Sequence, residues 1–578
     1  MQGHSEKIGF IWSVADLLRG DYRQSEYGRV ILPLVVLRRL DCVLESTKEA
    51  VLKRATSLPA TVDQTMRDTM LNAAAGQGFH NLSPFTFARL KADAENMEAN
   101  LMAYLNGFSA NVRDILIDRF ELPQQIARLE RSNLLFLVLS KFCEIDLHPE
   151  KVSNLAMGYI FEELIRRFSE ASNETAGEHF TPREVIRLMV NLLLHEDGEA
   201  LSKKGMIRTL YDPACGTGGM LSVAEEYLRD LNPDAKLVVF GQELNGESYA
   251  ICKSDMLIKG QDPGNIAFGN SFTEDGLKGK QFDYCLSNPP FGVEWKKVEK
   301  EITEEHQRLG LAGRFGAGLP RVSDGSLLFV QHMISKFRRD DGTSRLAVVL
   351  NGSPLFTGGA GSGESSIRQW IIENDWLEAI IGLPDQLFYN TGISTYVWII
   401  TNRKTPERRG KMQLIDATGM FEKMRKSLGN KRNVISEPQI TEITRLFGDM
   451  TQNEHSKVFD NEDFGYWRIT VERPLRDEAG NIVLGQKGKQ KGRPQPDSAL
   501  RDTENVPLGK DIEAYFAREV LPHAPDAWID EAKTKVGYEI PFNRHFYVFE
   551  PPRPLEVIDA ELKAVTANIM RMLGEMAE

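Results

Sequence analysis

The segment that decides the fold is residues 207–221, IRTLYDPACGTGGML. A short apolar run ends before Asp212, a glycine-rich turn follows, and a helical pattern begins at Gly219. Glycines let a backbone approach a ligand closely, and a helix N-terminus offers free N–H groups. This strand, turn and helix together predict a site for a nucleotide-like cofactor.

The chain around this segment alternates short β-branched or aromatic runs with helical stretches. We expect strands at 207–211, 237–242, 265–268, 282–287, 346–350, 377–383 and 395–401, and helices at 219–231, 247–259, 327–338 and 366–374. Such alternation predicts an α/β fold with an open, mostly parallel sheet and helices on both faces. Ligands of these sheets bind at the carboxyl ends of the strands, so the residues after each strand point to the function.

The glycine turn disfavours two common nucleotide sites. A dinucleotide fingerprint needs Gly or Ala where Leu221 stands. A Walker phosphate loop needs Gly-Lys-Ser/Thr, which occurs nowhere in the chain, including the glycine-rich residues 358–363. An acid at the head of the turn, Asp212, suits a cationic cofactor better than a pyrophosphate.

The next two expected strands end in polar residues that fit an adenosine cofactor. Glu243 closes the second strand, where an acid characteristically accepts hydrogen bonds from both ribose hydroxyls. Asn270 and Ser271 follow the third strand, where an adenine ring would lie. Each signal is weak alone, because polar residues at strand ends are often turn formers.

The fourth expected strand runs directly into Asn288-Pro289-Pro290-Phe291. Two prolines fix the backbone and remove two N–H donors, so the Asn288 side-chain oxygen and the Pro289 carbonyl can accept from one amino group. Phe291 then offers a flat face on which a planar base can stack. A Pro-Pro turn with a helix cap is the structural alternative.

The flanking regions differ from the central one. Residues 8–147 follow a helical pattern, and we expect a helical domain at 1–148, the α/β domain at 149–475 and a C-terminal region at 476–578. The pattern after residue 404 is irregular, and the Gly/Lys/Pro-rich residues 477–498 resemble a mobile loop. A heptad seam closes the chain with Leu555, Ile558, Leu562, Val565, Ile569, Met572 and Met576. This tail is either packed on its own domain or paired with a partner subunit.

Charge and composition limit the partners. The 578 residues carry a net charge of −12, which would repel a polyanion if spread evenly. Nucleic acid would therefore be contacted by local patches, such as residues 403–411, 423–432 and 487–493, or by a more basic partner; solvated loop charge is an equal alternative for each. No apolar run reaches about 18 residues, so we expect no membrane segment and a cytoplasmic location. The cysteines and histidines form no CxxC or HExxH, so we expect no protein-bound metal.

The order of these motifs resembles the amino-group DNA methyltransferases that use S-adenosylmethionine. The residues that carry the likeness are DPACGTGG at 212–219, the acid after the second strand and NPPF at 288–291. Together with GEHFTPR at 177–183, SDGSLLF at 323–329, LPDQLF at 383–388 and the helical N-terminus, the chain looks like the modification (M) subunit of type I restriction-modification systems. The resemblance implies a Rossmann-like methyltransferase domain with an all-helical N-terminal domain and a C-terminal helical tail.

The resemblance also implies roles for individual residues. Those expected to bind the cofactor are Glu178, His179, Phe180, Thr181, Pro182, Arg183, Asp212, Ala214, Gly216, Thr217, Gly218, Gly219, Glu243, Asn270 and Ser271. The expected catalytic residues are Asn288, Pro289, Pro290 and Phe291, which would face a flipped-out adenine. Asn270 departs from the Asp of many relatives, and we expect its amide oxygen still to accept from adenine N6.

The implied partners are double-stranded DNA, a specificity (S) subunit that reads the sequence, a second M subunit and a restriction (R) subunit that supplies ATP-driven cleavage. Two alternatives remain open at this point. The same NPPF logic occurs in methyltransferases that act on RNA or on protein glutamine, and a non-catalytic DNA-binding scaffold could keep the fold.

Overall fold

The computed structural model describes residues 2–59, 61–172, 181–198, 203–339, 344–389, 391–428, 430–486, 491–549 and 553–577. The chain divides into two compact units, Met1–Ile540 and Pro541–Glu578. None of the helices in the described part of the chain has both the length and the apolar composition needed to cross a bilayer.

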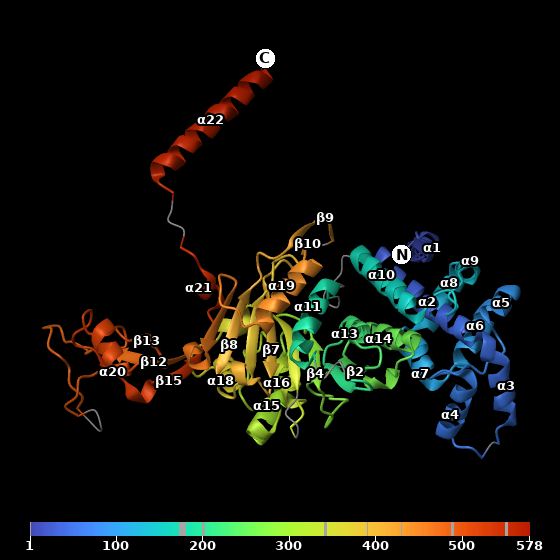
Figure 1. The fold of residues 1–578 in the computed structure, drawn as a ribbon, viewed down its shortest axis with the longest axis horizontal. Helices are drawn as coiled ribbons and strands as arrows, with labels where there is room; N and C mark the ends of the chain where they lie inside the picture. Colours follow the sequence, from blue (N-terminus) through green and yellow to red (C-terminus); the bar gives the residue numbers. More distant parts are fainter. Residues whose placement is uncertain are drawn as a thin grey trace. The chain divides into compact units, whose positions relative to one another are not determined.

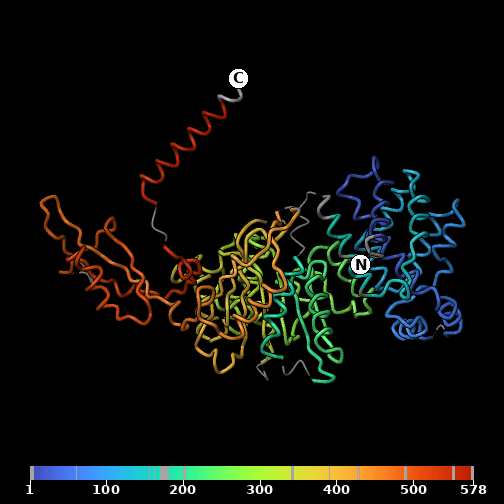
Figure 2. The backbone as a smooth tube through the Cα atoms, turned by 45° about the horizontal axis from the view of Figure 1, so that its top comes forward, coloured from blue at the N-terminus to red at the C-terminus, as the bar shows by residue number. Residues whose placement is uncertain are grey.

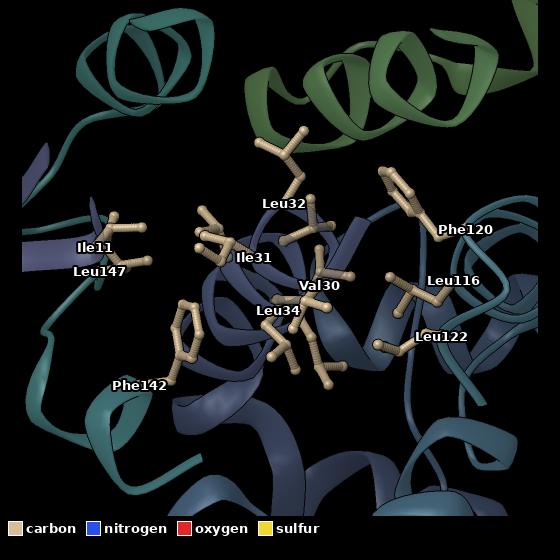
Figure 3. Close-up of a cluster of buried hydrophobic side chains, with 14 of the residues drawn as sticks. Ile11, Val30, Ile31, Leu32, Leu34, Leu116, Phe120, Leu122, Phe142 and Leu147 are labelled. Carbon is tan, nitrogen blue, oxygen red and sulfur yellow. The ribbon is translucent and has the colours of Figure 1, made fainter. Parts of the chain in front are cut away.

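The N-terminal region is helical, as expected. Its helices are α1 (Gln2–Leu18), α2 (Tyr27–Leu44), α3 (Lys48–Ser57), α4 (Gln64–Ala75), α5 (Phe87–Ala92), α6 (Met97–Asn106), α7 (Ala110–Arg113), α8 (Leu122–Arg131), α9 (Leu135–Glu144) and α10 (Asn154–Ser172). Helix α2 is apolar on nearly every side and is therefore buried at the centre, where Val30, Ile31 and Leu34 meet side chains of the surrounding helices (Figure 3). Helix α10, which the expected boundary at 148/149 assigned to the next domain, packs in this same core.

The central element is a nine-stranded sheet in the order β11-β8-β6-β7-β5-β4-β1-β2-β3. Its strands are β1 (Ile207–Asp212), β2 (Lys236–Glu243), β3 (Ile266–Phe268), β4 (Tyr284–Ser287), β5 (Arg345–Asn351), β6 (Leu377–Gly382), β7 (Thr395–Thr401), β8 (Lys411–Asp416) and β11 (Ser456–Asp460). Only β7 and β11 run antiparallel to their neighbours within this described sheet. The mostly parallel α/β sheet expected from the sequence is confirmed.

Helices cover both faces of the sheet. Helices α11 (Arg183–Leu194), α13 (Gly219–Leu231) and α19 (Glu437–Gly448) share one apolar core with the sheet. Helix α16 (Ser326–Ser335) lies on the other face, where its His332 meets Tyr211 of β1 at 3.0 Å. The remaining helices of this part are α14 (Gly246–Lys259), α15 (Glu299–Leu309), α17 (Ser353–Phe356) and α18 (Gly363–Glu373).

Helix α14 joins the sheet to the N-terminal helices. Its Cys252 and Met256 belong to the core of the sheet, whereas Ile251 and Ile258 belong to the core built around α2. Both views show the N-terminal helices, blue to cyan, on the flank of the sheet that carries α14 (Figures 1 and 2). The two regions therefore share one continuous body within the first unit.

The region after residue 404 is more regular than its sequence pattern predicts. Strands β8 and β11 extend the main sheet, β9 (Glu422–Leu428) pairs with β10 (Lys431–Val434), and a small sheet joins β12 (Gly465–Glu472) to β13 (Asp502–Pro507), β14 (Trp528–Ile529) and β15 (Lys535–Tyr538). The expected boundary at 475/476 falls inside this small sheet. The described residues of 477–498 lie between β12 and β13 and form isolated bridges.

Three described α-helices follow β13 along the chain, and β14 and β15 lie between the first and the second of them. Helix α20 (Ile512–Tyr515) belongs to the first unit, and α21 (Phe542–Phe546) and α22 (Leu555–Ala577) to the second. Most of the described apolar side chains of α22 are exposed, with Leu555 78% and Leu562 59% accessible.

Candidate active site

The candidate site lies where the direction of the chain through the sheet reverses. From β1 the chain runs outward through β2 and β3, whereas β4 and β5 lie on the other side of β1. A parallel sheet opens a crevice at such a switch point, beyond the carboxyl ends of the two strands. Here those ends are Asp212 of β1 and Ser287 of β4.

Asp212 ties the two strand ends together. Its Oδ1 accepts hydrogen bonds from Ser287 Oγ at 2.7 Å and from the Ala214 N–H at 3.0 Å. Only 1% of the Asp212 side chain is exposed, and this burial raises the pKa of its carboxyl to about 7, against the lowering effect of the two donors. Ionised Asp212 would therefore gain from a nearby cation.

The glycine turn needs glycine for steric reasons. Gly218 has φ +84° and precedes α13 directly, and a Cβ at this position would lie 2.8 Å from the Cys252 Sγ of α14. Gly216 is also left-handed, at φ +54°. The turn can therefore fold against α14 while it leaves its open side to a ligand.

Glu243, at the end of β2, holds this turn. Its Oε2 accepts from the Gly216 N–H at 2.8 Å, and its Oε1 accepts from the Asn245 N–H at 2.7 Å. The side chain is 7% exposed and lines the cavity described below. Each carboxylate oxygen can accept more than one hydrogen bond, so the carboxylate keeps capacity for ligand hydroxyls.

Asn270 and Ser271 follow β3 and close the other end of the site. Ser271 Oγ donates to the Pro213 carbonyl at 2.5 Å, which fixes this loop to the turn after β1. Asn270 Oδ1 accepts from the Phe272 N–H at 2.9 Å. The oxygen expected from the sequence to accept from adenine N6 therefore already has a partner within its own loop.

The side-chain oxygen of Asn288 is an unusual hydrogen-bond acceptor. Asn288 Nδ2 donates to Thr181 Oγ1 at 3.0 Å, which orients the amide, whereas its buried Oδ1 has no hydrogen-bond partner among the described residues. A buried polar atom without a partner costs about 1–3 kcal/mol. An oxygen kept in this state at the edge of a cavity fits a ligand that brings its own N–H or O–H.

A single cavity of about 630 Å³ joins these groups. Its lining includes the predicted residues Thr181, Asp212, Ala214, Gly216, Thr217, Gly219, Glu243, Asn270, Ser271, Asn288 and Pro290. Glu178, His179 and Phe180 lie outside the described residues. The volume falls within the range of roughly 300–1,000 Å³ typical of small-molecule sites.

Other predicted residues take supporting positions instead of lining this cavity. Gly218 packs behind the turn, and Pro182 precedes α11. The Arg183 guanidinium lies over the Tyr159 ring at 4.4 Å and 3.8 Å from Glu226. Pro289 is buried, and the Phe291 ring packs edge-on against Phe388 at 6.0 Å between centroids.

The cavity is also lined by residues that do not follow a strand end and that the sequence did not predict. The segment after NPPF supplies a second wall, with Trp295, Lys296 and Lys297, and Phe329 of α16 completes it. The signal was present in residues 292–295 (GVEW), which continue NPPF, and in SDGSLLF at 323–329, although neither pattern reveals which side chains face a ligand.

Arg314 supports the cavity from behind. Its guanidinium donates to the Ser271 and Phe272 carbonyls at 2.9 and 2.6 Å and pairs with Glu305 of α15 at 2.5 Å. The loop between β4 and β5 therefore clamps the loop after β3, a long-range contact that no local sequence pattern announces.

Comparison with known proteins agrees with this geometry. Residues 153–466, more than half of the chain, match the family described as N-6 DNA Methylase. The chain belongs to this family. Residues 9–142 match the HsdM N-terminal domain, so the helical region and the sheet of this N-6 DNA methylase each have a counterpart.

Individual relatives point the same way. The chain is 27% identical over 453 residues to the type I restriction enzyme MjaIX methylase subunit of Methanocaldococcus jannaschii, with 76% of each protein covered. It is 31% identical over 284 residues to the EcoEI methylase subunit of Escherichia coli, covering 47% of this chain and 51% of that protein. The methyltransferase subunit of a type I restriction-modification system from Streptococcus thermophilus shares the fold, with TM-score 0.62, 22% identity and coverage of 80% and 97%. The resemblance to type I modification subunits is confirmed.

Proposed function

We propose that this chain is the modification subunit of a type I restriction-modification complex and methylates N6 of adenine in double-stranded DNA, with S-adenosylmethionine as methyl donor. The observation that carries the proposal is Asn288 Oδ1, which has no hydrogen-bond partner among the described residues and lies in the same cavity as the Asp212–Gly219 turn and Glu243. The proposed acceptor for the base amine and the proposed cofactor cradle would thus share one cavity.

The residues present fit S-adenosylmethionine. The turn from Asp212 to Gly219 offers a backbone cradle beside a buried carboxylate, which suits the cationic methionine half. Glu243 would hold the ribose hydroxyls, and Asn270 with Ser271 would border the adenine. When bound, the cofactor supplies an electrophilic methyl group.

The chain's own residues would prepare the target amine. Adenine N6 is a poor nucleophile because its lone pair is delocalised into the ring. Asn288 Oδ1 would accept one N–H of this amine, with Thr181 fixing the amide orientation. The Pro289 carbonyl would accept the other, which favours a pyramidal nitrogen directed at the methyl group. Phe291 would contact the base, and Pro290 would shape the cavity wall.

The predicted residues outside the cavity take indirect roles in this proposal. Arg183, through Glu226 and Tyr159, would position the start of α11 and with it Pro182 and Thr181. Gly218 would let the turn close on α14. Glu178, His179 and Phe180 keep their proposed place beside the methionine half.

The proposal also covers the partner subunits of the chain and the location of their complex. An acidic chain binds phosphates weakly by itself, so a specificity subunit would deliver the DNA sequence, with a second M subunit and a restriction subunit completing the complex in the cytoplasm. The exposed apolar side chains of α22 would pack against the specificity subunit. We propose the functional division 1–148, 149–475 and 476–578, with α10 packed on the first part.

The test is the identity of the methylated atom. The full chain, with and without the subunits encoded beside it, is incubated with labelled S-adenosylmethionine and with DNA, RNA or release-factor protein. Label on adenine N6 of duplex DNA is expected. Label on RNA or glutamine, or no transfer by the complete assembly, would favour the two alternatives, which the family match does not support.

A further inference from the structure

The hairpin formed by β9 and β10 is a basic arm beside the site. Within the described residues the two strands pair with each other and stand apart from the nine-stranded sheet (Figure 1). Residues 423–432 read KMRKSLGNKR, one of the three basic stretches in a chain whose net charge is −12. The hairpin has no role in the function proposed above.

Three cations of this arm have no acidic partner among the described residues. Lys423 and Arg425 on β9 and Arg432 on β10 are exposed. No described acidic side chain lies within 4.0 Å of any of the three. They therefore differ from the buried Lys431 of the same hairpin, whose Nζ forms an ion pair with Glu184.

The base of the hairpin is anchored firmly. Lys431 Nζ also donates to the Leu387 carbonyl at 3.0 Å, and its side chain is almost fully buried. Asn433 Nδ2 donates to the Asp385 carbonyl at 3.0 Å, and the Arg432 N–H donates to the Gln386 carbonyl at 2.9 Å. The loop at 383–389 therefore carries the arm.

Both anchors adjoin the residues proposed to hold the target base. Phe388, next to Leu387, packs against Phe291. Glu184 lies three residues after Thr181, whose hydroxyl accepts from Asn288. The base of the arm is thus tied, through Glu184 and the loop at 383–389, to the two segments that contact Asn288 and Phe291.

We propose that Lys423, Arg425 and Arg432 bind backbone phosphates of the DNA next to the flipped-out adenine. The proposal rests on the proposed function and specifies a surface for its substrate. Charge complementarity selects the occupant, because guanidinium groups match phosphate oxygens and an otherwise acidic chain needs local cations to approach a polyanion. A duplex held at this arm presents its target strand to Asn288.

The test compares two triple variants of equal charge change in the complete assembly with its specificity subunit. The first is Lys423→Gln, Arg425→Gln and Arg432→Gln. The control is Lys204→Gln, Lys236→Gln and Lys278→Gln, three exposed lysines before β1, at the start of β2 and before β4, at the opposite edge of the sheet. Binding of short duplexes with and without the recognition sequence is measured over a range of salt concentrations.

The arm variant is expected to weaken both duplexes similarly, by about tenfold or more, and to lower the slope of log affinity against log salt by about 1 per cation. The control and S-adenosylmethionine binding should stay near wild type. An arm variant that matches the control in affinity and salt slope overturns this proposal. A wild-type assembly that binds DNA but transfers no methyl group overturns the proposed function instead.

Discussion

The substitution Glu243→Gln tests the proposed cofactor site independently of the rest of the fold. In the wild type both carboxylate oxygens of Glu243 accept a backbone N–H, from Gly216 at 2.8 Å and from Asn245 at 2.7 Å. Glutamine keeps the size of the side chain but offers one acceptor oxygen, so its NH2 group must face one of these two donors. The substitution therefore loosens the glycine turn and removes the charged acceptor for the ribose.

The size of the effect follows from the bonds involved. A hydrogen bond to a charged group contributes about 1.5–3 kcal/mol. Since 1.36 kcal/mol corresponds to a tenfold change, loss of one such bond predicts S-adenosylmethionine affinity weaker by about 10- to 150-fold. The measurement is isothermal titration calorimetry on the full chain.

The matched control is Glu247→Gln, four residues further along. Glu247 is on α14, and its half-exposed carboxylate lies 3.6 Å from Arg29. This variant should bind the cofactor within about twofold of wild type, because exposed ion pairs contribute little. A folded Glu243→Gln variant with equally unchanged affinity would refute the assignment of Glu243.

Two further predictions concern the tail and the pH dependence of stability. Deleting residues 555–578 should impair assembly with the specificity subunit and sequence-directed methylation, because α22 exposes the apolar Val565 and Ile569. Binding of S-adenosylmethionine should persist, because the residues that line the cavity lie far from α22 in the sequence. A full complex of the truncated chain in size-exclusion chromatography with light scattering would contradict this prediction. The variant Asp212→Asn tests the raised pKa of the Asp212 carboxyl. The folded state keeps the Asp212 proton up to about pH 7, whereas the unfolded chain loses it near pH 4. Between these pH values the free energy of unfolding of the wild type should therefore fall relative to that of the variant by about 1.4 kcal/mol per pH unit. Differential scanning calorimetry at several pH values checks it, and a difference in Tm that is constant with pH would rule out the burial effect.

Much of the sheet could be predicted because its strands are buried on both sides and separated by clear turns. The strand at 395–401 and the helix at 219–231 match β7 and α13 at both ends. Where ends differ, side-chain hydrogen bonds explain the shift. Helix α18 begins at Gly363 because Ser362 Oγ caps the Ser365 N–H, and β4 begins only at Tyr284 because Asp283 turns its carboxylate to the Thr209 N–H.

The region after residue 404 escaped prediction for a different reason. Strand β9 is exposed and charged. Lys431 on β10 can be buried because Glu184, more than two hundred residues earlier, neutralises it and the Leu387 carbonyl accepts from its Nζ. The same limit applies at the site. Strand ends located Asp212, Glu243 and Asn288, but the clamp of Arg314 on the loop after β3 arises from tertiary contacts alone.

The central claim is that Asn288 Oδ1 accepts a hydrogen bond from the adenine amine. The most direct measurement is nucleoside mass spectrometry of duplex DNA after single-turnover reaction with wild type and Asn288→Ala, alongside calorimetry of S-adenosylmethionine binding. We predict N6-methyladenine with the wild-type assembly and none with Asn288→Ala, at a cofactor affinity within a few fold of wild type. Retained formation of N6-methyladenine by Asn288→Ala would contradict the account.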